Sequence, residues 1–162
     1  MNTLILKKSK NGKGVFANKD FKKNEQVIEF KGKLLKYRQF PSHYTKFEDH
    51  CAQIGKNLYI GPSGKIDDFF NHSCSPNSGL RIKGRKAFLV AIKNIKKGGE
   101  ITWDYSTTMD EDSWEIECDC GNKNCRKRIR DFKYLPKKIQ QKYARLEIVP
   151  KYLVEKFDNL YK

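Results

Sequence analysis

Long apolar runs are missing from this sequence. The N-terminal segment, MNTLILKKSK, turns basic after a few apolar residues, too few for the core of a secretory signal. No later apolar run is long enough to span a membrane. We therefore expect no membrane association and an intracellular location. The location would be the cytoplasm in a microbial source, and the nucleus is a second option in a eukaryotic source.

Basic residues are missing from one segment of an otherwise basic protein. Residues 100–119, called the acidic segment below, contain no lysine or arginine, although the chain holds 34 of them. The same segment holds 8 acidic residues, whereas the net charge of the chain is +15. One interpretation is a solvated loop that improves solubility. The other is a local attraction for a cationic substrate, which the rest of the protein would repel.

Repeats and low-complexity segments are also absent, and 38% of the 162 residues are hydrophobic, which indicates a folded protein of about one domain. The first hundred residues contain short segments rich in β-branched and aromatic residues, separated by turn signals. After Cys125 the pattern changes. Residues 136–146 predict a helix with Pro136 in its first turn, and residues 150–161 predict a second. We expect a mainly β chain with a helical C-terminal tail.

Cysteines are few, yet three of the five fall close together in CDCGNKNC, at Cys118, Cys120 and Cys125. Inside a cell, clustered thiols more often bind metal than form disulfides. Three thiolates are one short of the four ligands of a tetrahedral structural zinc site. The spacing therefore predicts zinc binding, with a fourth ligand from elsewhere in the chain.

The first candidates for this fourth ligand are Cys74 and Cys51, and His72 ranks after them. Cys51 belongs to DHCAQIG, which reads as a half-buried strand, where a cysteine usually acts as a small hydrophobic residue. Cys74 belongs to the polar loop NHSCSPN, where packing as a small hydrophobic residue is a weaker explanation for a cysteine than in a half-buried strand. We therefore favour Cys74.

Two further stretches have a structural and a functional interpretation. Residues 11–20, NGKGVFANKD, read as a hairpin turn or as a place where the backbone approaches a ligand closely. They lack the ending of a nucleotide P-loop and the following helix of a dinucleotide fingerprint. Residues 98–106, GGEITWDYS, look like a strand leading into the acidic segment. By itself, Tyr105 would be an ordinary half-buried strand tyrosine.

Taken in order, GKGVFA, DDFFNHSCSPN, GEITWDY and CDCGNKNCR resemble the SET-domain protein-lysine methyltransferases that carry a post-SET zinc module. The resemblance covers residues 3–130. It implies a mainly β (β+α) fold of small curved sheets around a pseudoknot. It also implies a SET domain over 1–110 and a post-SET cysteine module over 111–130, followed by a C-terminal helical tail over 131–162. The chain has no room for further zinc clusters or targeting domains, so it resembles the small standalone type.

The resemblance also implies a ligand set. S-adenosylmethionine would be the methyl donor, and Tyr105 the catalytic residue. The cofactor-binding residues would be Gly12, Lys13, Gly14, Val15, Asn71, His72 and Tyr105. The ligands of a structural Zn²⁺ would be Cys74, Cys118, Cys120 and Cys125. Transfer of methyl from a sulfonium to an amine depends mainly on positioning. A lysine of ordinary pKa, about 10.4, must first lose its proton, and a dry channel beside a positive sulfonium favours that loss.

Three positions depart from the family pattern. Asp68 stands where many members have arginine. Trp103 occupies the position, two residues before Tyr105, where phenylalanine or tyrosine usually tunes the number of methyl groups transferred. His50 falls near the usual place of a channel tyrosine. We expect Trp103 and His50 to line the substrate channel.

The predicted partner is a protein with a lysine in a basic segment, histone-like or ribosomal. The competing hypothesis is a basic, zinc-containing nucleic-acid-binding module without catalysis, since RKRIRDFK follows the last cysteine and aromatic residues are interspersed beyond it. Both properties are compatible, because a basic C-terminal region would bring an enzyme to nucleic-acid-associated proteins. A third hypothesis is a catalytically inactive family member that acts as a scaffold.

Overall fold

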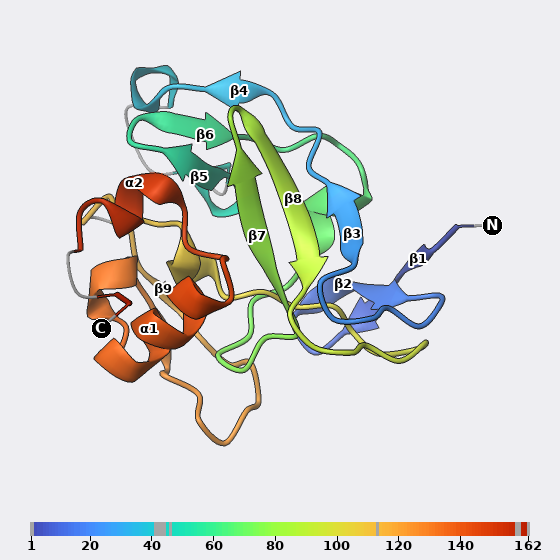
Figure 1. The fold of residues 1–162 in the computed structure, drawn as a ribbon. Helices are drawn as coiled ribbons and strands as arrows, with labels where there is room; N and C mark the ends of the chain where they lie inside the picture. The colour runs from blue at the N-terminus through green and yellow to red at the C-terminus, as the bar shows by residue number, and fades with distance from the viewer. Residues whose placement is uncertain (1, 41–44, 46, 113, 158–159, 162) are drawn as a thin grey trace.

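The computed structural model describes residues 2–40, 45, 47–112, 114–157 and 160–161. The regular secondary structure of this part of the chain consists mostly of small antiparallel sheets (Figure 1). One sheet pairs β1 (Leu4–Ser9) with β2 (Gly12–Ala17). Two more have the orders β3 (Gln26–Glu29), β8 (Lys86–Ala91), β7 (Ser78–Lys83) and β4 (Leu34–Leu35), β6 (Leu58–Ile60), β5 (Ala52–Gly55). The last pairs β9 (Ile116–Glu117) with β10 (Arg128–Ile129). The predicted mainly β fold is confirmed.

The described helices are short, and none is long and apolar enough to cross a membrane. Five are single 3₁₀ turns, η1 (Tyr37–Gln39), η2 (Glu48–His50), η3 (Ile66–Phe69), η4 (Tyr105–Thr107) and η5 (Phe132–Tyr134). The helix predicted over 136–146 is α1 (Lys137–Arg145). The one predicted over 150–161 is present only as α2 (Lys151–Val154), and Phe157, three residues after its end, packs against Phe132 at 5.6 Å between ring centroids. Asp158 and Asn159 lie outside the described residues.

The interior has two parts. The larger core packs between the β1–β2 and β3–β8–β7 sheets, and it includes Val15, Leu80 and Trp103. The second core lies where α1 and α2 cover the sheet beside β7, and there Phe132, Tyr143, Ile148 and Leu153 pack against Val90 and Ile92 (Figure 1). The fit is close: a side chain at Gly79 would lie 2.7 Å from Ile148. The tail is therefore a packed layer of the molecule.

Residues 100–103 lie between two segments that precede them in sequence. On one side the amide of Ile101 donates to the Val15 carbonyl at 2.8 Å. On the other, Trp103 forms a parallel bridge with His72, and the Ser78 amide donates to the Thr102 carbonyl at 3.0 Å. This arrangement brings the three stretches GKGVFA, NHSC and EITWDY to one place.

Candidate active site

Asn71 connects the three stretches by hydrogen bonds. Its Nδ2 donates to the Lys13 carbonyl at 3.1 Å and to Glu100 Oε1 at 2.7 Å. Glu100 also accepts a hydrogen bond from Ser9 Oγ at 2.8 Å. The turn between β1 and β2 is therefore held against the NHSC loop by side chains that face each other.

Local geometry explains why glycine occupies positions 12 and 14. Gly12 has a φ of +89°, a conformation that favours glycine. A Cβ at Gly14 would lie 2.3 Å from Glu100 Oε1 and 2.8 Å from Asn71 Nδ2, so any larger residue would displace these side chains. Val15 is fully buried in the larger core. Gly14 and Val15 thus shape the turn from inside the protein, whereas Lys13 lines a cavity.

His72 is buried between the site and the cysteines. Its Nδ1 accepts a hydrogen bond from the Tyr105 amide at 3.2 Å, and its Nε2 lies 3.3 Å from Cys74 Sγ. Because Nδ1 accepts, a neutral ring carries its proton on Nε2 and donates it toward the sulfur. Burial, with help from the Arg126 charge, lowers the pKa of His72 to about 4 against the opposing effect of Asp104, so the ring is neutral at physiological pH.

Tyr105 begins the 3₁₀ turn η4. Its hydroxyl donates to the Phe70 carbonyl at 2.7 Å, and its ring lies 4.9 Å from Trp103 and 5.3 Å from His72, centroid to centroid. Burial raises the pKa of Tyr105 above its usual range, so the hydroxyl stays protonated at neutral pH. Its chemical capacity is to donate and accept hydrogen bonds in a fixed direction, and it is unsuited to act as a strong base.

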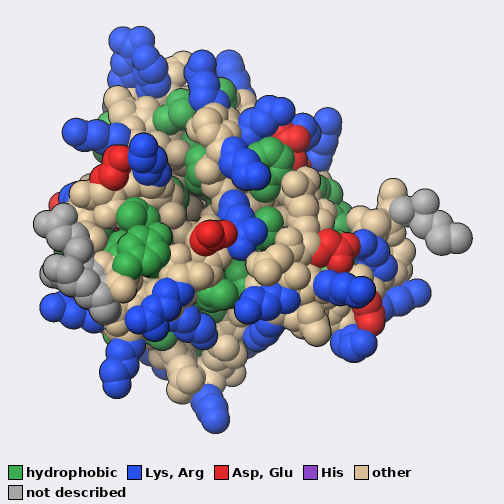
Figure 2. Space-filling model, in the orientation of Figure 1, with side chains coloured by type: hydrophobic (Ala, Val, Ile, Leu, Met, Phe, Trp, Pro, Cys, Tyr) green, Lys and Arg blue, Asp and Glu red, His purple; other side chains and the backbone are tan. Residues whose placement is uncertain are grey.

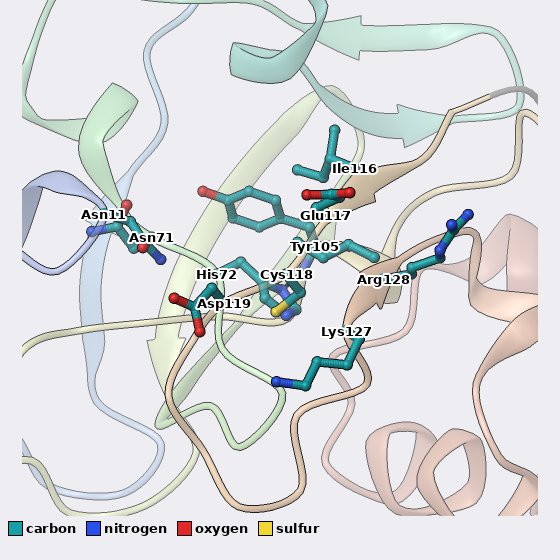
Figure 3. A pocket seen from close by; sticks show the side chains of 11 residues that line it. Asn11, Asn71, His72, Tyr105, Ile116, Glu117, Cys118, Asp119, Lys127 and Arg128 are labelled. Carbon is teal, nitrogen blue, oxygen red and sulfur yellow. Dashed lines mark hydrogen bonds between the residues drawn. The ribbon is translucent and has the colours of Figure 1, made fainter.

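Tyr105 lies between an open cavity and a narrow slot. The cavity, of about 570 Å³, is lined by Asn71, His72 and Tyr105 together with residues around β9 and β10 (Figure 3). This volume falls in the usual range of small-molecule sites. The slot, of about 40 Å³, has Tyr105 in its wall as well. A third hollow of about 350 Å³, which includes Lys13 and Asn71, also reaches Tyr105.

The walls of the slot are largely aromatic. Trp103 and His50, the two predicted channel residues, line it, and so do Phe30, Phe70 and Trp114. Phe30 stacks on Phe70 at 5.9 Å and meets Trp103 edge-on at 6.4 Å. Sequence reasoning missed Phe30, Phe70 and Trp114 as slot residues. Phe70 lies in the stretch DDFFNHSCSPN, but nothing there indicates what its ring contacts, and Phe30 and Trp114 lie outside every motif.

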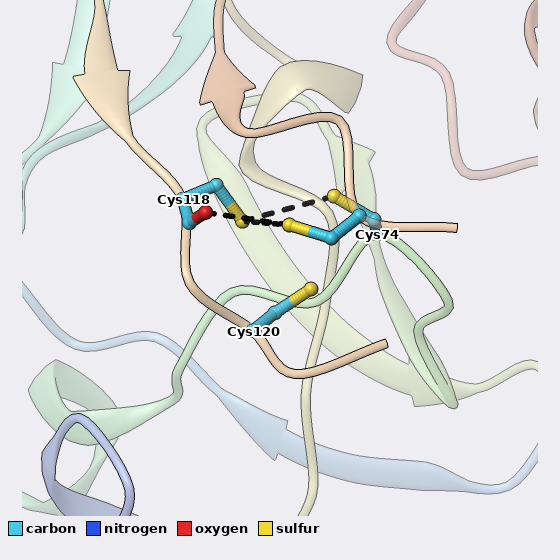
Figure 4. A group of neighbouring side chains, drawn as sticks. Cys74, Cys118 and Cys120 are labelled. Carbon is cyan, nitrogen blue, oxygen red and sulfur yellow. Dashed lines mark hydrogen bonds between the residues drawn. The ribbon is translucent and has the colours of Figure 1, made fainter. Parts of the chain in front are cut away.

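Four cysteine sulfurs converge on one point. The sulfurs of Cys74, Cys118, Cys120 and Cys125 all lie within 4.8 Å of one another (Figure 4). Cys118 Sγ is 3.8 Å from Cys74 Sγ and 3.6 Å from Cys125 Sγ. A tetrahedral zinc with Zn–S bonds of about 2.3 Å separates its sulfurs by about 3.8 Å, whereas a disulfide would hold two of them at about 2.0 Å. The four residues therefore fit a zinc ion.

The surroundings of these sulfurs also suit thiolates. The amide of Arg126 points at Cys74 Sγ from 3.4 Å, and Asn122 Nδ2 points at Cys120 Sγ from 3.5 Å. Donors of this kind stabilise negative sulfur and orient metal ligands. Cys51, the other candidate, lies apart from the group, with its thiol 3.4 Å from the Phe47 carbonyl.

Carboxylates of the acidic segment form ion pairs with basic side chains that follow it in the sequence. Asp110 forms an ion pair with Lys156 at 2.7 Å, Asp112 with Lys133, and Glu115 with Arg130 at 2.9 Å. These carboxylates are already compensated within the protein, which argues against the interpretation of this segment as the attraction for a cationic substrate.

Two carboxylates of η3, those of Asp67 and Asp68, lie beside the slot. Asp68 accepts hydrogen bonds from the amides of Ser63 and Gly64, and Asp67 accepts one from the Lys31 amide. Both residues line the slot. Within the described part of the chain, no lysine or arginine side chain forms an ion pair with either of them.

Comparison with known proteins places these features in a family. The SET domain model matches residues 12–106. A variant-silencing SET domain-containing protein of Plasmodium falciparum is 34% identical over 137 residues, and a histone-lysine N-methyltransferase of Schizosaccharomyces pombe, H3 lysine-4 specific, is 30% identical over 125 residues. These alignments cover 75% and 70% of this chain but only 5% and 13% of the two relatives.

A solved structure shows the same fold. The structure of KRYPTONITE with mCHG DNA and SAH (S-adenosylhomocysteine) superposes with a TM-score of 0.62 and 25% sequence identity. The match covers 78% of this chain and 29% of that one.

Proposed function

Because the chain belongs to the SET-domain family, we propose that it transfers methyl groups from S-adenosylmethionine to the lysine side-chain amine of a protein. The observation that carries this proposal is the position of Tyr105 between a ligand-sized cavity and a narrow aromatic slot. The names of relatives add support, since several are histone-lysine N-methyltransferases, and KRYPTONITE was solved with SAH.

The cavity suits the donor. S-adenosylmethionine supplies a methyl group on a sulfonium and also carries an amine and a carboxylate. The cavity lining offers both signs of charge, with Glu117 beside Arg128 on the β9–β10 ladder and with Asp119 and Lys127 also in the lining (Figure 3). Asn71 and His72 lie on the side toward Tyr105, where the sulfonium would meet the slot.

The slot suits a lysine side chain. Its aromatic residues desolvate an inserted amine, which lowers the pKa of the amine, whereas Asp67 and Asp68 in the same lining favour the protonated form on entry. The protonated amine is held by ring faces before it loses its proton to solvent. The Tyr105 hydroxyl, fixed by its bond to the Phe70 carbonyl, then orients the neutral amine for in-line attack.

We also propose that the four cysteines bind one structural zinc ion. Cys118 itself lines the cavity, and so do the strands β9 and β10 on either side of the cysteine loop. An ion held by Cys74, Cys118, Cys120 and Cys125 would tie this wall to the NHSC loop. Zinc has no redox chemistry, so its contribution would be to hold the cavity together.

For the substrate we propose a histone-like or ribosomal protein with its lysine in a basic segment. The Schizosaccharomyces pombe relative is named as a histone-lysine N-methyltransferase, and Asp67 and Asp68 supply negative charge beside the slot. We extend the proposal to nucleic-acid association, since KRYPTONITE was solved with DNA. Figure 2 shows many lysine and arginine side chains and few acidic ones over the face that carries α1 and α2.

The test is methyl transfer with labelled S-adenosylmethionine, zinc-replete protein and a panel of basic proteins and peptides. We expect label on lysine, and a loss of about 100-fold or more in turnover with Tyr105→Phe. In Asp68→Asn, the KM of a lysine-rich peptide should rise about three- to tenfold with kcat little changed. Asp20→Asn, far from the slot and paired with Lys96, is the matched control.

Two results would contradict the proposal. Protein that neither binds S-adenosylmethionine nor labels any substrate is no methyltransferase, and nucleic-acid binding with a steep salt dependence would then favour the non-catalytic zinc module. Cofactor binding without label, even with an extract of basic proteins as substrate, would favour the inactive scaffold.

A further inference from the structure

The C-terminal tail, residues 131–162, lies outside the matched family region yet reaches the turn that carries Tyr105. We propose that Tyr143 of α1 and Asp104 form a positioning pair through which the tail sets the orientation of Tyr105. The inference rests on the proposed function, because it assigns these two residues a part in the same active site.

Asp104 holds the 3₁₀ turn η4 in place. It is fully buried, immediately precedes Tyr105 and caps η4, with Oδ1 accepting a hydrogen bond from the Ser106 amide at 3.1 Å. Its backbone carbonyl accepts a further bond from Thr107 Oγ1 at 2.7 Å. The direction in which Tyr105 leaves the backbone therefore depends on how the Asp104 side chain is held.

Two donors outside the turn hold this carboxylate, and His72 Nδ1 lies 3.5 Å from its Oδ1 without donating to it. Arg126, the residue after the last cysteine of the cluster, donates from Nη2 to Oδ1 at 2.7 Å. Tyr143 donates its hydroxyl to Oδ2 at 3.0 Å. A buried carboxylate has no water to replace a lost donor, so each of these bonds constrains its orientation strongly. Removing the Tyr143 hydroxyl would leave Asp104 Oδ2 without a hydrogen-bond donor from the described part of the chain.

Tyr143 is itself well anchored. Its side chain is 1% exposed and packs in the second core with Ile148 and Leu153. The position of its hydroxyl is therefore set by the packing of α1 on the sheet and not by the site. This is the property that a positioning residue needs, because a mobile partner would transmit no constraint.

The tail also holds the chain that follows the turn. The Tyr152 hydroxyl donates to the Thr108 carbonyl, and the Phe132 amide donates to the Met109 carbonyl at 3.0 Å. Met109 lines the slot. The tail thus supports both the turn that begins at Asp104 and the slot wall that follows it.

The experiment compares Tyr143→Phe with Tyr161→Phe, a tyrosine of the same tail that is 61% exposed. Turnover is expressed per cofactor-binding site, so that a loss of folded protein does not count. We expect Tyr143→Phe to lower kcat about tenfold, with zinc content and S-adenosylmethionine affinity within about twofold of wild type. Tyr161→Phe should match wild type. Equal kcat per site in the two variants, with only a lower Tm for Tyr143→Phe, would overturn the inference.

A second measurement does not need methyl transfer. Amide hydrogen exchange at Ser106, whose N–H is bonded to Asp104, should be about tenfold faster in Tyr143→Phe than in Tyr161→Phe. An unchanged exchange rate would overturn the inference whether or not the protein is active. Absence of label from wild type would instead count against the proposed function, so the two failures are distinguishable.

Discussion

Gly14 lies where the β1–β2 turn meets Asn71 and Glu100, and its missing side chain is what lets those two residues approach. The sequence allowed two interpretations of this stretch, a hairpin turn or a close approach to a ligand, and the structure shows the hairpin. The atoms that crowd position 14 belong to the protein itself. The motif shows that a small residue is needed at position 14. The neighbours that require it, Asn71 and Glu100, lie 57 and 86 residues further along the chain, where the motif gives no sign of them.

We predict that Gly14→Ala weakens S-adenosylmethionine binding by about tenfold or more, because the new Cβ would displace Glu100 or Asn71 and so disturb the cavity edge. Calorimetric titration checks this. Gly84→Ala is the control: its φ is +60° with open space around it, so it loses about 1 kcal/mol of stability without touching the site. Equal cofactor affinity in the two variants would contradict the argument.

Asp104 and Phe70 show what the sequence could not reveal about single residues. The four cysteines and Tyr105 fall in recognisable motifs, so their grouping could be anticipated. The Asp104–Tyr143 bond joins residues 39 apart and depends on how α1 packs. Phe70 contributes a carbonyl to Tyr105 and a ring to the slot, and neither role leaves a mark in the sequence.

Among the elements, the β9–β10 ladder is the least able to stand alone. Each strand has two residues, and they pair only through Glu117 with Arg128 and Ile116 with Ile129. So short a ladder is unstable in water without further support. The cysteine loop between the strands supplies that support if it holds a metal ion, because the ion crosslinks the loop to Cys74.

We therefore predict one zinc ion per chain, and its loss in Cys74→Ser. Without the ion, the cavity wall formed by β9 and β10 should loosen, with S-adenosylmethionine affinity falling about tenfold or more. Elemental analysis and cofactor titration measure the two effects. Cys51→Ser, outside the cluster, should keep its zinc. A full zinc complement in Cys74→Ser would refute this ligand assignment.

Longer elements were easier to anticipate than short ones. The α1 helix has a clear start at Pro136 and spans nearly the predicted residues. α2 ends after four residues because Phe157 turns inward against Phe132, a contact that helical periodicity alone does not show. β9 and β10 escaped prediction because two residues carry no detectable alternation.

At the scale of the whole molecule, the two cores meet on one strand. In β8, Leu89 belongs to the larger core, whereas its neighbour Val90 belongs to the second. A sequence division at residue 131 separates the tail from the SET domain, but a sheet packed on both faces couples them. Charges connect the two parts as well, since Asp110 and Asp112 of the acidic segment pair with Lys156 and Lys133 of the tail.

We predict that the protein unfolds in a single cooperative transition that includes the tail. Leu153→Ala, at a fully buried position of the second core, should lower the free energy of unfolding by about 2–5 kcal/mol and leave one transition. Leu6→Ala, 38% exposed in β1, should lower it by less than about 1 kcal/mol. Differential scanning calorimetry decides the matter, because two separate transitions would mean that the tail is an independent unit.

The crossing of residues 100–103 over β2 also has a consequence for biosynthesis. A ribosome releases the β1–β2 hairpin early, but the Val15 carbonyl receives the Ile101 amide only when residue 101 emerges, and Cys74 meets the other cysteines of its cluster only after Cys118 emerges. Pairings so distant in sequence form slowly, and their apolar faces stay exposed meanwhile. The nascent chain should therefore depend on chaperones until α1 has left the exit tunnel and covered the sheet.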